Sequence, residues 1–346
     1  MLNPILTEDQ LVQIHAWLKD CQRFVLCGHV SPDGDALGST LGLASYLKGL
    51  GKDVTVVMPN HFPEFLAWLK GSEDVLFYSE SPELVKKTIQ DAEVIGCLDF
   101  NDLSRLEELG EIIGTSSADF WMIDHHLQPG DFCKVTVSHP TASSTCELVF
   151  RIIWQLGGLD AFTQESAEAI YCGMCTDTGG FTYNSNNSDI FFIIGLLLKK
   201  GIDKDVIYRK IYNNYSESRI RLMGYVLYEK LQVMADCHAS FFTLTRDELE
   251  QFNYVKGDTE GLVNIPLTIK GMKLSISLRE DLEKDRVMMS LRSVDDFPCN
   301  KMAEEFFNGG GHKNAAGGRL DCSLEEAVEI VKKAICCYEP LLVDKK

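Results

Sequence analysis

The sequence predicts an α/β protein with two domains: a larger one built on a parallel sheet with helices on both faces, and a smaller α+β one. The chain has 346 residues, more than the roughly 250 to 300 at which a single core stops growing. Its first half alternates short apolar runs with helical patterns, the order that builds parallel sheets. We expect domains at 1–215 and 236–346, a linker helix at 216–235, and a cleft between the domains.

The strands expected in the first domain are apolar along nearly their whole length. They are FVLCGHV (24–30), DVTVVMP (53–59), AEVIGCLDF (92–100) and ADFWMIDHH (118–126). Strands buried on both faces have this composition, which indicates a parallel sheet between two layers of helices. Helices are expected at 35–50, 63–70, 143–156 and 164–174, and in the apolar segment that ends at Lys200.

The second domain has a different pattern, in which strand-like runs follow one another with polar turns between them. These runs are 240–245, 263–269 (VNIPLTI), 273–280 and 286–293. Helices are expected at 299–308 and 324–336, with the glycines 309–311 between them. Strands grouped in this way predict an α+β domain.

The composition excludes several classes of protein. The longest apolar run, 190–198, is far shorter than the roughly 20 residues of a membrane span, and no secretory signal is visible, so we expect a cytoplasmic location. The net charge of −18 argues against a protein that grips long nucleic-acid duplexes. The 12 cysteines are scattered and are expected to be reduced; Cys172 and Cys175 match half of a zinc or redox site, but no similar pair follows.

Acidic residues and histidines gather where the expected strands end. They are His29, Asp33 and Asp35 at and just after the end of the first strand, Asp99 at the end of the third, Asp124, His125 and His126 at the end of the fourth, and Asp177 on the loop after a helix. Because the carboxyl ends of parallel strands meet at one edge of a sheet, we expect these side chains to converge. Together they supply enough ligands for two cations, with one or two carboxylates shared.

This mixture of ligands points to a particular chemistry. Carboxylate oxygens with some imidazole nitrogens suit manganese better than a metal that prefers thiolates, and they also suit magnesium or another divalent ion. Two ions roughly 3.5 to 4 Å apart activate water and brace the leaving oxygen of an in-line displacement at phosphorus. The cluster therefore predicts hydrolysis of phosphate esters.

Each acidic residue also has a purely structural interpretation. A carboxylate after a strand or helix can cap a helix, shape a turn or face solvent, and this holds for Asp33, Asp99 and Asp177. The run 124–126 is harder to explain in this way, because buried imidazoles and carboxylates need partners. The signal comes from the set in its order along the chain.

A glycine run precedes His312 in the second domain. Gly309, Gly310 and Gly311 let successive N–H groups point into one concavity that binds an anion, and His312 can add a hydrogen bond or a positive charge. A helix C-cap followed by a tight turn would explain one of these glycines but not all of them. We expect the run to bind substrate.

These motifs resemble those of the DHH/DHHA1 phosphoesterases along nearly the whole chain. The first domain carries HxxxDxD at 29–35, a single Asp99, DHH at 124–126 and Asp177, and the second carries GGGH at 309–312. The resemblance implies a DHH domain that binds two manganese ions and a DHHA1 domain that binds substrate. Ser31 departs from the pattern, since relatives often have Asn there, and this puts in doubt the contacts behind the ligands rather than metal binding.

The resemblance also implies a role for each motif residue. One ion would be held by His29, Asp33, Asp99 and Asp177, and the other by Asp35, Asp99, His125 and Asp177, so that Asp99 and Asp177 bridge. His126 would contact the scissile phosphate or donate a proton, and Asp124 would orient the histidines. Gly309–His312 would clamp a terminal phosphate or sugar. Arg279 and Arg292 are further candidates for phosphate or base contacts, or else ordinary surface charges.

Within the family, the chain is most similar to the two-domain nanoRNases that also dephosphorylate 3′-phosphoadenosine 5′-phosphate. It shows neither the membrane and sensory segments of the large cyclic-dinucleotide phosphodiesterases nor the extra domains of RecJ-type exonucleases. We expect short single-stranded oligonucleotides or small nucleotides as substrates, no long duplex or membrane as partner, and a homodimer through the first domain from the resemblance.

Other functions stay open at this point. A soluble cyclic di-AMP or pApA phosphodiesterase would use the same metals and a similar clamp. An exopolyphosphatase or pyrophosphatase would use the same metal scaffold, although pyrophosphate alone needs no nucleoside clamp. A nucleotide-binding protein without turnover would not need the histidines that handle protons. A dehydrogenase is disfavoured because no G-x-G-x-x-G follows the first strand.

Overall fold

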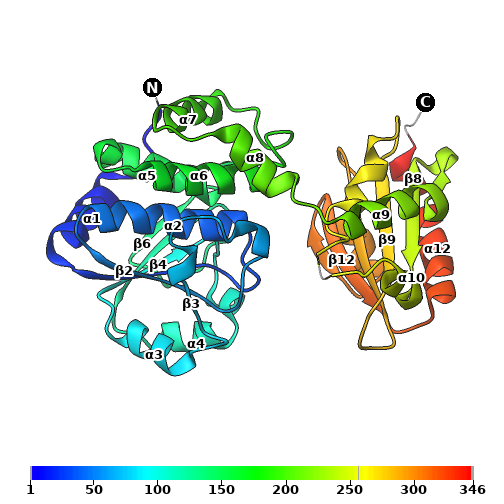
Figure 1. The fold of residues 1–346 in the computed structure, drawn as a ribbon, viewed down its shortest axis with the longest axis horizontal. Helices are drawn as coiled ribbons and strands as arrows, with labels where there is room; N and C mark the ends of the chain where they lie inside the picture. The colour runs from blue at the N-terminus through cyan, green and yellow to red at the C-terminus, as the bar shows by residue number, and fades with distance from the viewer. Residues whose placement is uncertain (1, 256, 344–346) are drawn as a thin grey trace. The chain divides into compact units, whose positions relative to one another are not determined.

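The computed structural model describes residues 2–255 and 257–343 of the chain. The chain divides between Asn214 and Tyr215 into two compact units, each with its own sheet and its own core (Figure 1). The predicted α/β fold class is confirmed. Within the described ranges, the helices all lack the length or the hydropathy that a membrane crossing requires.

The described residues of the first unit form a six-stranded sheet in which every neighbouring pair is parallel. Its strands are β1 (Arg23–Cys27), β2 (Asp53–Met58), β3 (Leu76–Phe77), β4 (Val94–Leu98), β5 (Asp119–Asp124) and β6 (Val135–Ser138). Their order is β3-β2-β1-β4-β5-β6, so the direction of winding reverses between β1 and β4. Open sheets place their sites at such a switch point, at the carboxyl ends of the strands.

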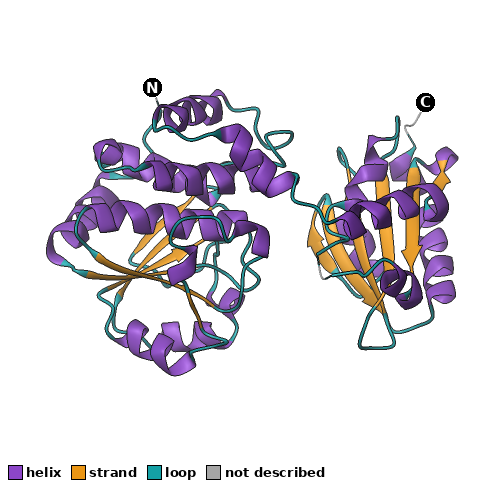
Figure 2. Ribbon diagram, in the orientation of Figure 1, coloured by secondary structure: helices purple, strands orange, loops and turns teal. Residues whose placement is uncertain are grey.

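Helices cover both faces of this sheet (Figure 2). One face carries α1 (Glu8–Asp20), α2 (Gly34–Gly49), α5 (Thr145–Gln155) and α6 (Gln164–Asp177), with α7 (Ser188–Lys199) and α8 (Lys204–Tyr212) packed on α6; the other carries α3 (Pro82–Gln90) and α4 (Glu108–Gly114). Alternate residues of β1 show the two layers. Phe24 and Leu26 belong to the core on one side, and Val25 and Cys27 to the core on the other. The predicted parallel sheet between two helical layers is confirmed.

The second unit is an α+β structure with a mixed sheet in the order β11-β12-β10-β9-β8-β7. Its strands are β7 (Gln232–Met234), β8 (Ala239–Leu244), β9 (Leu274–Glu280), β10 (Val287–Ser293), β11 (Gly310–His312) and β12 (Ala315–Leu320). The pair β8–β9 is parallel and the other pairs are antiparallel. Its helices are α9 (Glu217–Tyr225), the π-helical η5 (Val226–Lys230), α10 (Arg246–Gln251), α11 (Cys299–Phe306) and α12 (Leu324–Leu342).

Three expected elements differ in the structure. The strand expected at 263–269 is the 3-10 helix η7 (Leu262–Thr268), because Pro266 has no N–H to give to a sheet. The helix expected at 63–70 is reduced to the short 3-10 helix η1 (Glu64–Leu66). The helix expected at 216–235 ends at Lys230, where the chain turns into β7.

The helix expected as a linker belongs to the core of the second unit. Leu222 of α9 and Val226 of η5 are buried in one cluster with Phe242 and Leu244 of β8. An amphipathic helix is stabilised mainly by burying its apolar face, and here the sheet of the second unit provides that surface.

We expect Gly173→Ala to lower the free energy of unfolding by about 1–3 kcal/mol, the usual cost of overpacking a core. Gly173 lies where α2, α5 and α6 meet, and an added Cβ would clash with the Cys146 sulfur and lie 3.0 Å from the Asp35 Cα atom. Urea unfolding measures the change.

Gly195→Ala is the matched control for this prediction. Gly195 also lies inside a helix, but an added Cβ there meets no heavy atom within 4 Å. Stability should therefore stay unchanged or rise by up to about 1 kcal/mol, since Ala favours a helix over Gly. Equal stability of Gly173→Ala and the wild type would show that the close packing of these helices is not required.

Candidate metal centre and active site

The acidic residues and histidines of the first unit come from neighbouring element ends. His29 follows β1, Asp33 and Asp35 begin α2, Asp99 follows β4, and the run 124–126 ends β5 and continues past it. Because β1, β4 and β5 are adjacent in the sheet, their carboxyl ends bring these side chains to one edge. Asp177, expected on a loop, is instead the last residue of α6.

The side chains converge into overlapping groups, within which the possible ligand atoms lie within 4.8 Å of one another. The groups are His29, Asp33 and Asp99; Asp35, His125 and Asp177; and Asp99, His125 and His126. His125 Nε2 lies 3.2 Å from Asp177 Oδ2 and 3.6 Å from Asp99 Oδ1, which joins the first two groups. All six residues expected to bind metal are therefore brought together.

Asp33 also has a structural role, and Asp99 has an uncommon backbone conformation. Asp33 is the N-cap of α2, and its Oδ1 accepts the N–H groups of Asp35 and Ala36 at 2.9 and 3.0 Å. The capping interpretation of Asp33 is thus correct, and the residue is still within reach of His29 and Asp99. Asp99 has a left-handed φ of 64°, a conformation that Asp adopts at lower cost than most residues.

The N-terminus of α5 holds Asp35 and Asp99 in place. The N–H groups of Thr145 and Cys146 donate to the two oxygens of Asp35 at 2.6 and 2.9 Å, and Thr145 Oγ1 donates to Asp99 Oδ1 at 2.9 Å. Helix N-termini favour negative charge, and their first N–H groups have no partner within the helix. Sequence reasoning missed this contact; the Ser-Ser-Thr run before the helix marks a cap but not what the cap binds.

A buried ion-pair network fixes the segment before α5. Glu147 Oε2 accepts the N–H and the hydroxyl of Ser143 at 2.8 and 2.7 Å. Its other oxygen accepts from Arg151 at 2.8 Å, and Arg151 also donates to Asp189 at 2.9 Å. Both Glu147 and Arg151 are buried, so removing either partner would leave an uncompensated buried charge.

Two histidines present the same ring nitrogen to the carboxylates. His29 Nδ1 lies 2.8 Å from the Val30 carbonyl, and His125 Nδ1 lies 3.3 Å from the Ala142 carbonyl. A proton on Nδ1 in each ring leaves Nε2 as an acceptor, and metal-binding histidines are oriented in this way. His29 Nε2 is 3.4 Å from Asp99 Oδ2.

His126 has a different environment from His125. Its Nδ1 lies 2.7 Å from Asp124 Oδ1, and its backbone N–H donates to Asp124 Oδ2 at 2.9 Å. Asp124 is buried and His126 is partly exposed. A carboxylate that accepts the Nδ1 proton fixes the orientation of the imidazole ring.

The electrostatics of the cluster favour a bound cation. Burial, followed by the charges of Asp35, Asp33 and Asp177, raises the pKa of Asp99 well above its usual range. Burial, with Asp35 and Asp33 beside it, raises the pKa of Asp177 to about 9. Carboxylates crowded in this way repel one another when ionised, and divalent cations relieve that repulsion. Oxygen and imidazole donors therefore fit a divalent metal ion.

In the second unit, the expected substrate residues divide into two places. Arg292 of β10 pairs with Ala315 of β12, which pairs with His312 of β11, so Arg292 and His312 lie in one row on one face. On β9, the partner of Arg292 is Ser275, and Arg279 lies four residues further along that strand. At the usual rise per residue, Arg279 is therefore roughly 13 Å along the strand from the row of Arg292 and His312. Arg279 instead lies over the ring of Tyr254 at 5.5 Å.

The glycine run has a structural use of its own. Gly310 and Gly311 are in β11, and Gly311 has a φ of 138°. A Cβ at Gly309 would lie 2.6 Å from the Gly318 Cα atom of β12. Close pairing with β12 therefore requires glycine at positions 309 and 311, in addition to any contact with substrate, whereas a side chain would fit at Gly310.

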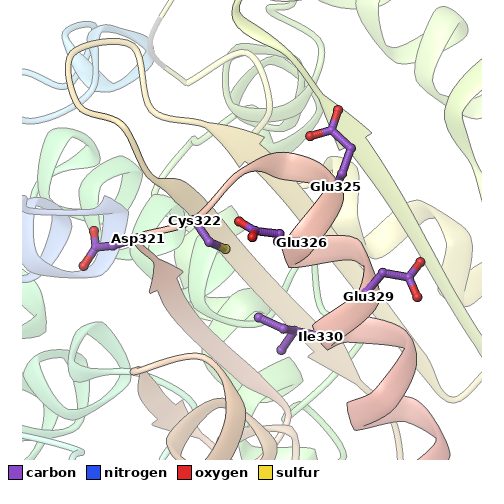
Figure 3. A pocket seen from close by; sticks show the side chains of 6 residues that line it. All are labelled: Asp321, Cys322, Glu325, Glu326, Glu329 and Ile330. Carbon is purple, nitrogen blue, oxygen red and sulfur yellow. The ribbon is translucent and has the colours of Figure 1, made fainter.

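A surface hollow of 680 Å³ in the second unit is a poor candidate for phosphate binding. It is lined by Asp321, Cys322, Glu325, Glu326, Glu329 and Ile330, on and just before α12 (Figure 3). Four carboxylates would repel a phosphate.

Cys172 and Cys175, the pair with zinc-like spacing, are buried inside α6 as free thiols.

Comparisons with known proteins agree with this geometry. The model of the DHH family, N-terminal domain, matches residues 23–174, and the DHHA1 domain model matches residues 237–336. The bifunctional oligoribonuclease and PAP phosphatase NrnA of Thermus thermophilus is 30% identical over 309 residues, which cover 89% of this chain and 87% of that protein. The chain belongs to the DHH/DHHA1 phosphoesterases. It is a metal-dependent hydrolase of phosphate esters.

Two solved structures are similar to this DHH/DHHA1 protein. An exopolyphosphatase-related protein from Bacteroides fragilis is 52% identical, with a TM-score of 0.96 and coverage of 99% of both chains. RecJ in complex with Mn²⁺ from Thermus thermophilus shares the fold, at 14% identity and a TM-score of 0.50, over 97% of this chain and 55% of that one.

The stability of the metal-free DHH/DHHA1 protein should fall as pH rises from about 4 to about 9. Asp177 has a pKa of about 9 in the folded state and about 3.9 when unfolded. Between these values the folded protein holds a proton that the unfolded chain has lost, so the free energy of unfolding decreases with pH. Calorimetry in EDTA at about pH 6 and about pH 8.5 measures the slope, which Asp177→Asn should reduce.

Added Mn²⁺ should reverse this trend, because the ion binds ionised carboxylates and its affinity rises with pH. The increase in melting temperature on adding Mn²⁺ should thus be larger at the higher pH. An increase of the same size at both pH values would contradict binding at this cluster.

Thr145→Val should weaken Mn²⁺ binding by roughly tenfold, since contacts behind metal ligands typically contribute 10–100-fold. The substitution removes the hydroxyl that donates to Asp99 Oδ1 and leaves a buried acceptor unsatisfied. Titration calorimetry measures the affinity. Thr145→Ser keeps the hydroxyl and should bind Mn²⁺ like the wild type; equal affinity in all three proteins would rule out this role.

Proposed function

We propose that this phosphoesterase hydrolyses short oligoribonucleotides and 3′-phosphoadenosine 5′-phosphate with two divalent metal ions. The preferred ion is manganese, and magnesium is the alternative. The proposal rests on two neighbouring groups of possible ligands in the first unit, one that contains Asp99 and one that contains Asp177. His125 Nε2 lies close to a carboxylate oxygen of each group. Support for these substrates comes from the similarity to the oligoribonuclease and PAP phosphatase NrnA of Thermus thermophilus, which is 30% identical.

We assign each ligand group to one ion. His29, Asp33, Asp99 and Asp177 would hold the first, and Asp35, Asp99, His125 and Asp177 the second, with Asp99 and Asp177 shared. When bound, the two ions supply Lewis-acid activation of the phosphoryl group and of a water nucleophile. The N–H groups of Thr145 and Cys146 and the Thr145 hydroxyl, at the N-terminus of α5, keep Asp35 and Asp99 at fixed positions, so little reorganisation is needed when ions and substrate bind.

His126 is assigned the proton transfer. Asp124 would accept the Nδ1 proton and fix the ring, so that Nε2 would donate a proton to the leaving oxygen. Histidine is the side chain that most often acts as a general acid or base in enzymes.

The row of Arg292 and His312 is assigned the binding of a second phosphate or a sugar. Both side chains lie on the same face of the sheet, in a row that passes through Ala315 of β12, and a guanidinium with an imidazole can together hold a phosphate. Arg279 is too distant to join this row and stays a separate prediction, as do the homodimer and the cytoplasmic location.

Hydrolysis of polyphosphate is the second candidate. The exopolyphosphatase-related protein from Bacteroides fragilis is 52% identical over nearly the whole chain, a higher identity than that of the oligoribonuclease. A cyclic di-AMP or pApA phosphodiesterase would use the same ligands. The substrates, not the metal centre, separate these functions.

One panel of substrates tests the proposal. The protein with Mn²⁺ is incubated with 5′-phosphorylated di- to pentaribonucleotides, 3′-phosphoadenosine 5′-phosphate, cyclic di-AMP and polyphosphate, and products are separated by chromatography. We expect mononucleotides from the oligonucleotides and 5′-AMP from the bisphosphate. Phosphate release from polyphosphate alone would replace the proposal by the second candidate.

Asp99→Asn should reduce turnover of every substrate in the panel to below about 1% of the wild-type rate, as expected for loss of a shared ligand. Asn tolerates the left-handed φ at this position and can still accept from Thr145, so the fold is retained. Circular dichroism checks the fold. Unchanged turnover in a folded variant would remove the two-ion mechanism.

A further inference from the structure

A tight turn joins Asp177 to an exposed tyrosine. Gly179, Gly180 and Phe181 follow one another with left-handed φ values of 54°, 70° and 64°. Thr178 is buried; its hydroxyl donates to the Met174 carbonyl at 2.6 Å and accepts the Phe181 N–H at 3.0 Å. The turn is therefore held at the end of α6, whose last residue has its carboxylate 3.2 Å from His125 Nε2.

Tyr183 lies against this turn. Its N–H donates to the Thr178 carbonyl at 3.2 Å. A Cβ at Gly179 would lie 2.8 Å from the ring carbon Cζ of Tyr183, so the ring rests on the glycine backbone. The side chain is nevertheless 59% exposed, which leaves much of the ring open to solvent.

Two further tyrosines from α8 extend this surface. A Cβ at Gly180 would lie 3.2 Å from a ring carbon of Tyr208, whose ring centroid is 4.8 Å from that of Tyr212. The Tyr212 hydroxyl donates to the Cys175 carbonyl at 2.8 Å, which ties α8 to α6. Tyr208 is 45% exposed. Tyr183, Tyr208 and Tyr212 are called the tyrosine platform below.

Tyr212 packs against the core of the first unit, but that core does not explain the exposed rings of Tyr183 and Tyr208. Tyr183 and Tyr208 contribute exposed aromatic surface, whereas the buried cluster on this side of the sheet is filled by other side chains. Both rings pack on glycines at positions two and three after Asp177, and any larger residue at Gly179 would displace Tyr183. Aromatic rings held firmly beside a phosphate-hydrolysing centre are suited to stack on bases, since every base has a π-face.

We propose that the tyrosine platform is a subsite for a nucleobase, with Tyr183 as the main stacking residue. The inference rests on the proposed function and narrows it, because a substrate would need a base next to the scissile phosphate. Stacking does not depend on the identity of the base, so the subsite accepts purines and pyrimidines. Polyphosphate, which has no base, gains nothing from it.

The test compares two substrates that differ only in the base. The full chain with Mn²⁺ is assayed on 3′-phosphoadenosine 5′-phosphate and on the same bisphosphate of 1-deoxyribose, which lacks adenine. Tyr183→Ala should raise KM for the adenine substrate about tenfold, as expected when one base–aromatic stack is lost. It should leave kcat/KM for the baseless substrate unchanged, and Tyr183→Phe should behave like the wild type.

Tyr228→Ala is the matched control, because Tyr228 is an 86% exposed tyrosine of the second unit and lies outside the platform. It should change neither KM. An equal loss by Tyr183→Ala on both substrates would mean that Tyr183 only supports the turn, and no loss on either would remove the subsite.

Binding of 5′-AMP separates this inference from the proposed function. Titration calorimetry with Mn²⁺ present should show about tenfold weaker binding to Tyr183→Ala than to the wild type, whether or not the protein hydrolyses nucleotides. If the wild type turns over no nucleotide but shows this difference, the proposed function fails and the subsite stands. Equal affinity of both proteins for 5′-AMP overturns the subsite.

Discussion

The candidate metal centre depends on hydrogen bonds from the N-terminus of α5 to the buried carboxylates of Asp35 and Asp99. An ionised carboxylate buried without partners would cost more than the 5–15 kcal/mol by which a typical domain is stable. Among the described residues, the ion-pair partners found for Asp35 and Asp99 are histidines, not lysines or arginines. The N–H groups of Thr145 and Cys146 and the Thr145 hydroxyl therefore provide the fixed polar contacts of these carboxyl oxygens.

This arrangement holds the acids together while leaving their charge uncompensated. Hydrogen bonds from backbone and hydroxyl groups fix the positions of the oxygens but do not add a full positive charge, so the pKa values of Asp99 and Asp177 stay raised. A divalent ion then gains from neutralising several carboxylates without having to reorganise them. The close packing of α2, α5 and α6 at Gly173 and the network of Glu147 and Arg151 keep this geometry rigid.

The two units differ in what they offer a substrate. The first brings carboxylates and histidines together from the ends of β1, β4, β5 and α6 and from the start of α2, and it exposes Tyr183 and Tyr208 near the end of α6. The second offers Arg292 and His312 in one row of an antiparallel sheet. Its glycine run lets the chain pair closely with β12 at Gly309 and Gly311, where a side chain would clash.

Local sequence was enough to predict the parallel sheet, the α+β unit and the convergence of residues such as His29, Asp99 and His125, because the carboxyl ends of adjacent parallel strands always meet at one edge. Tertiary structure alone decided that Thr145 holds Asp35, 110 residues away, and that Tyr183 rests on the turn after Asp177. It also decided that antiparallel register separates Arg279 from Arg292. These contacts depend on how elements pack and on strand register, which leave no periodic pattern in the chain.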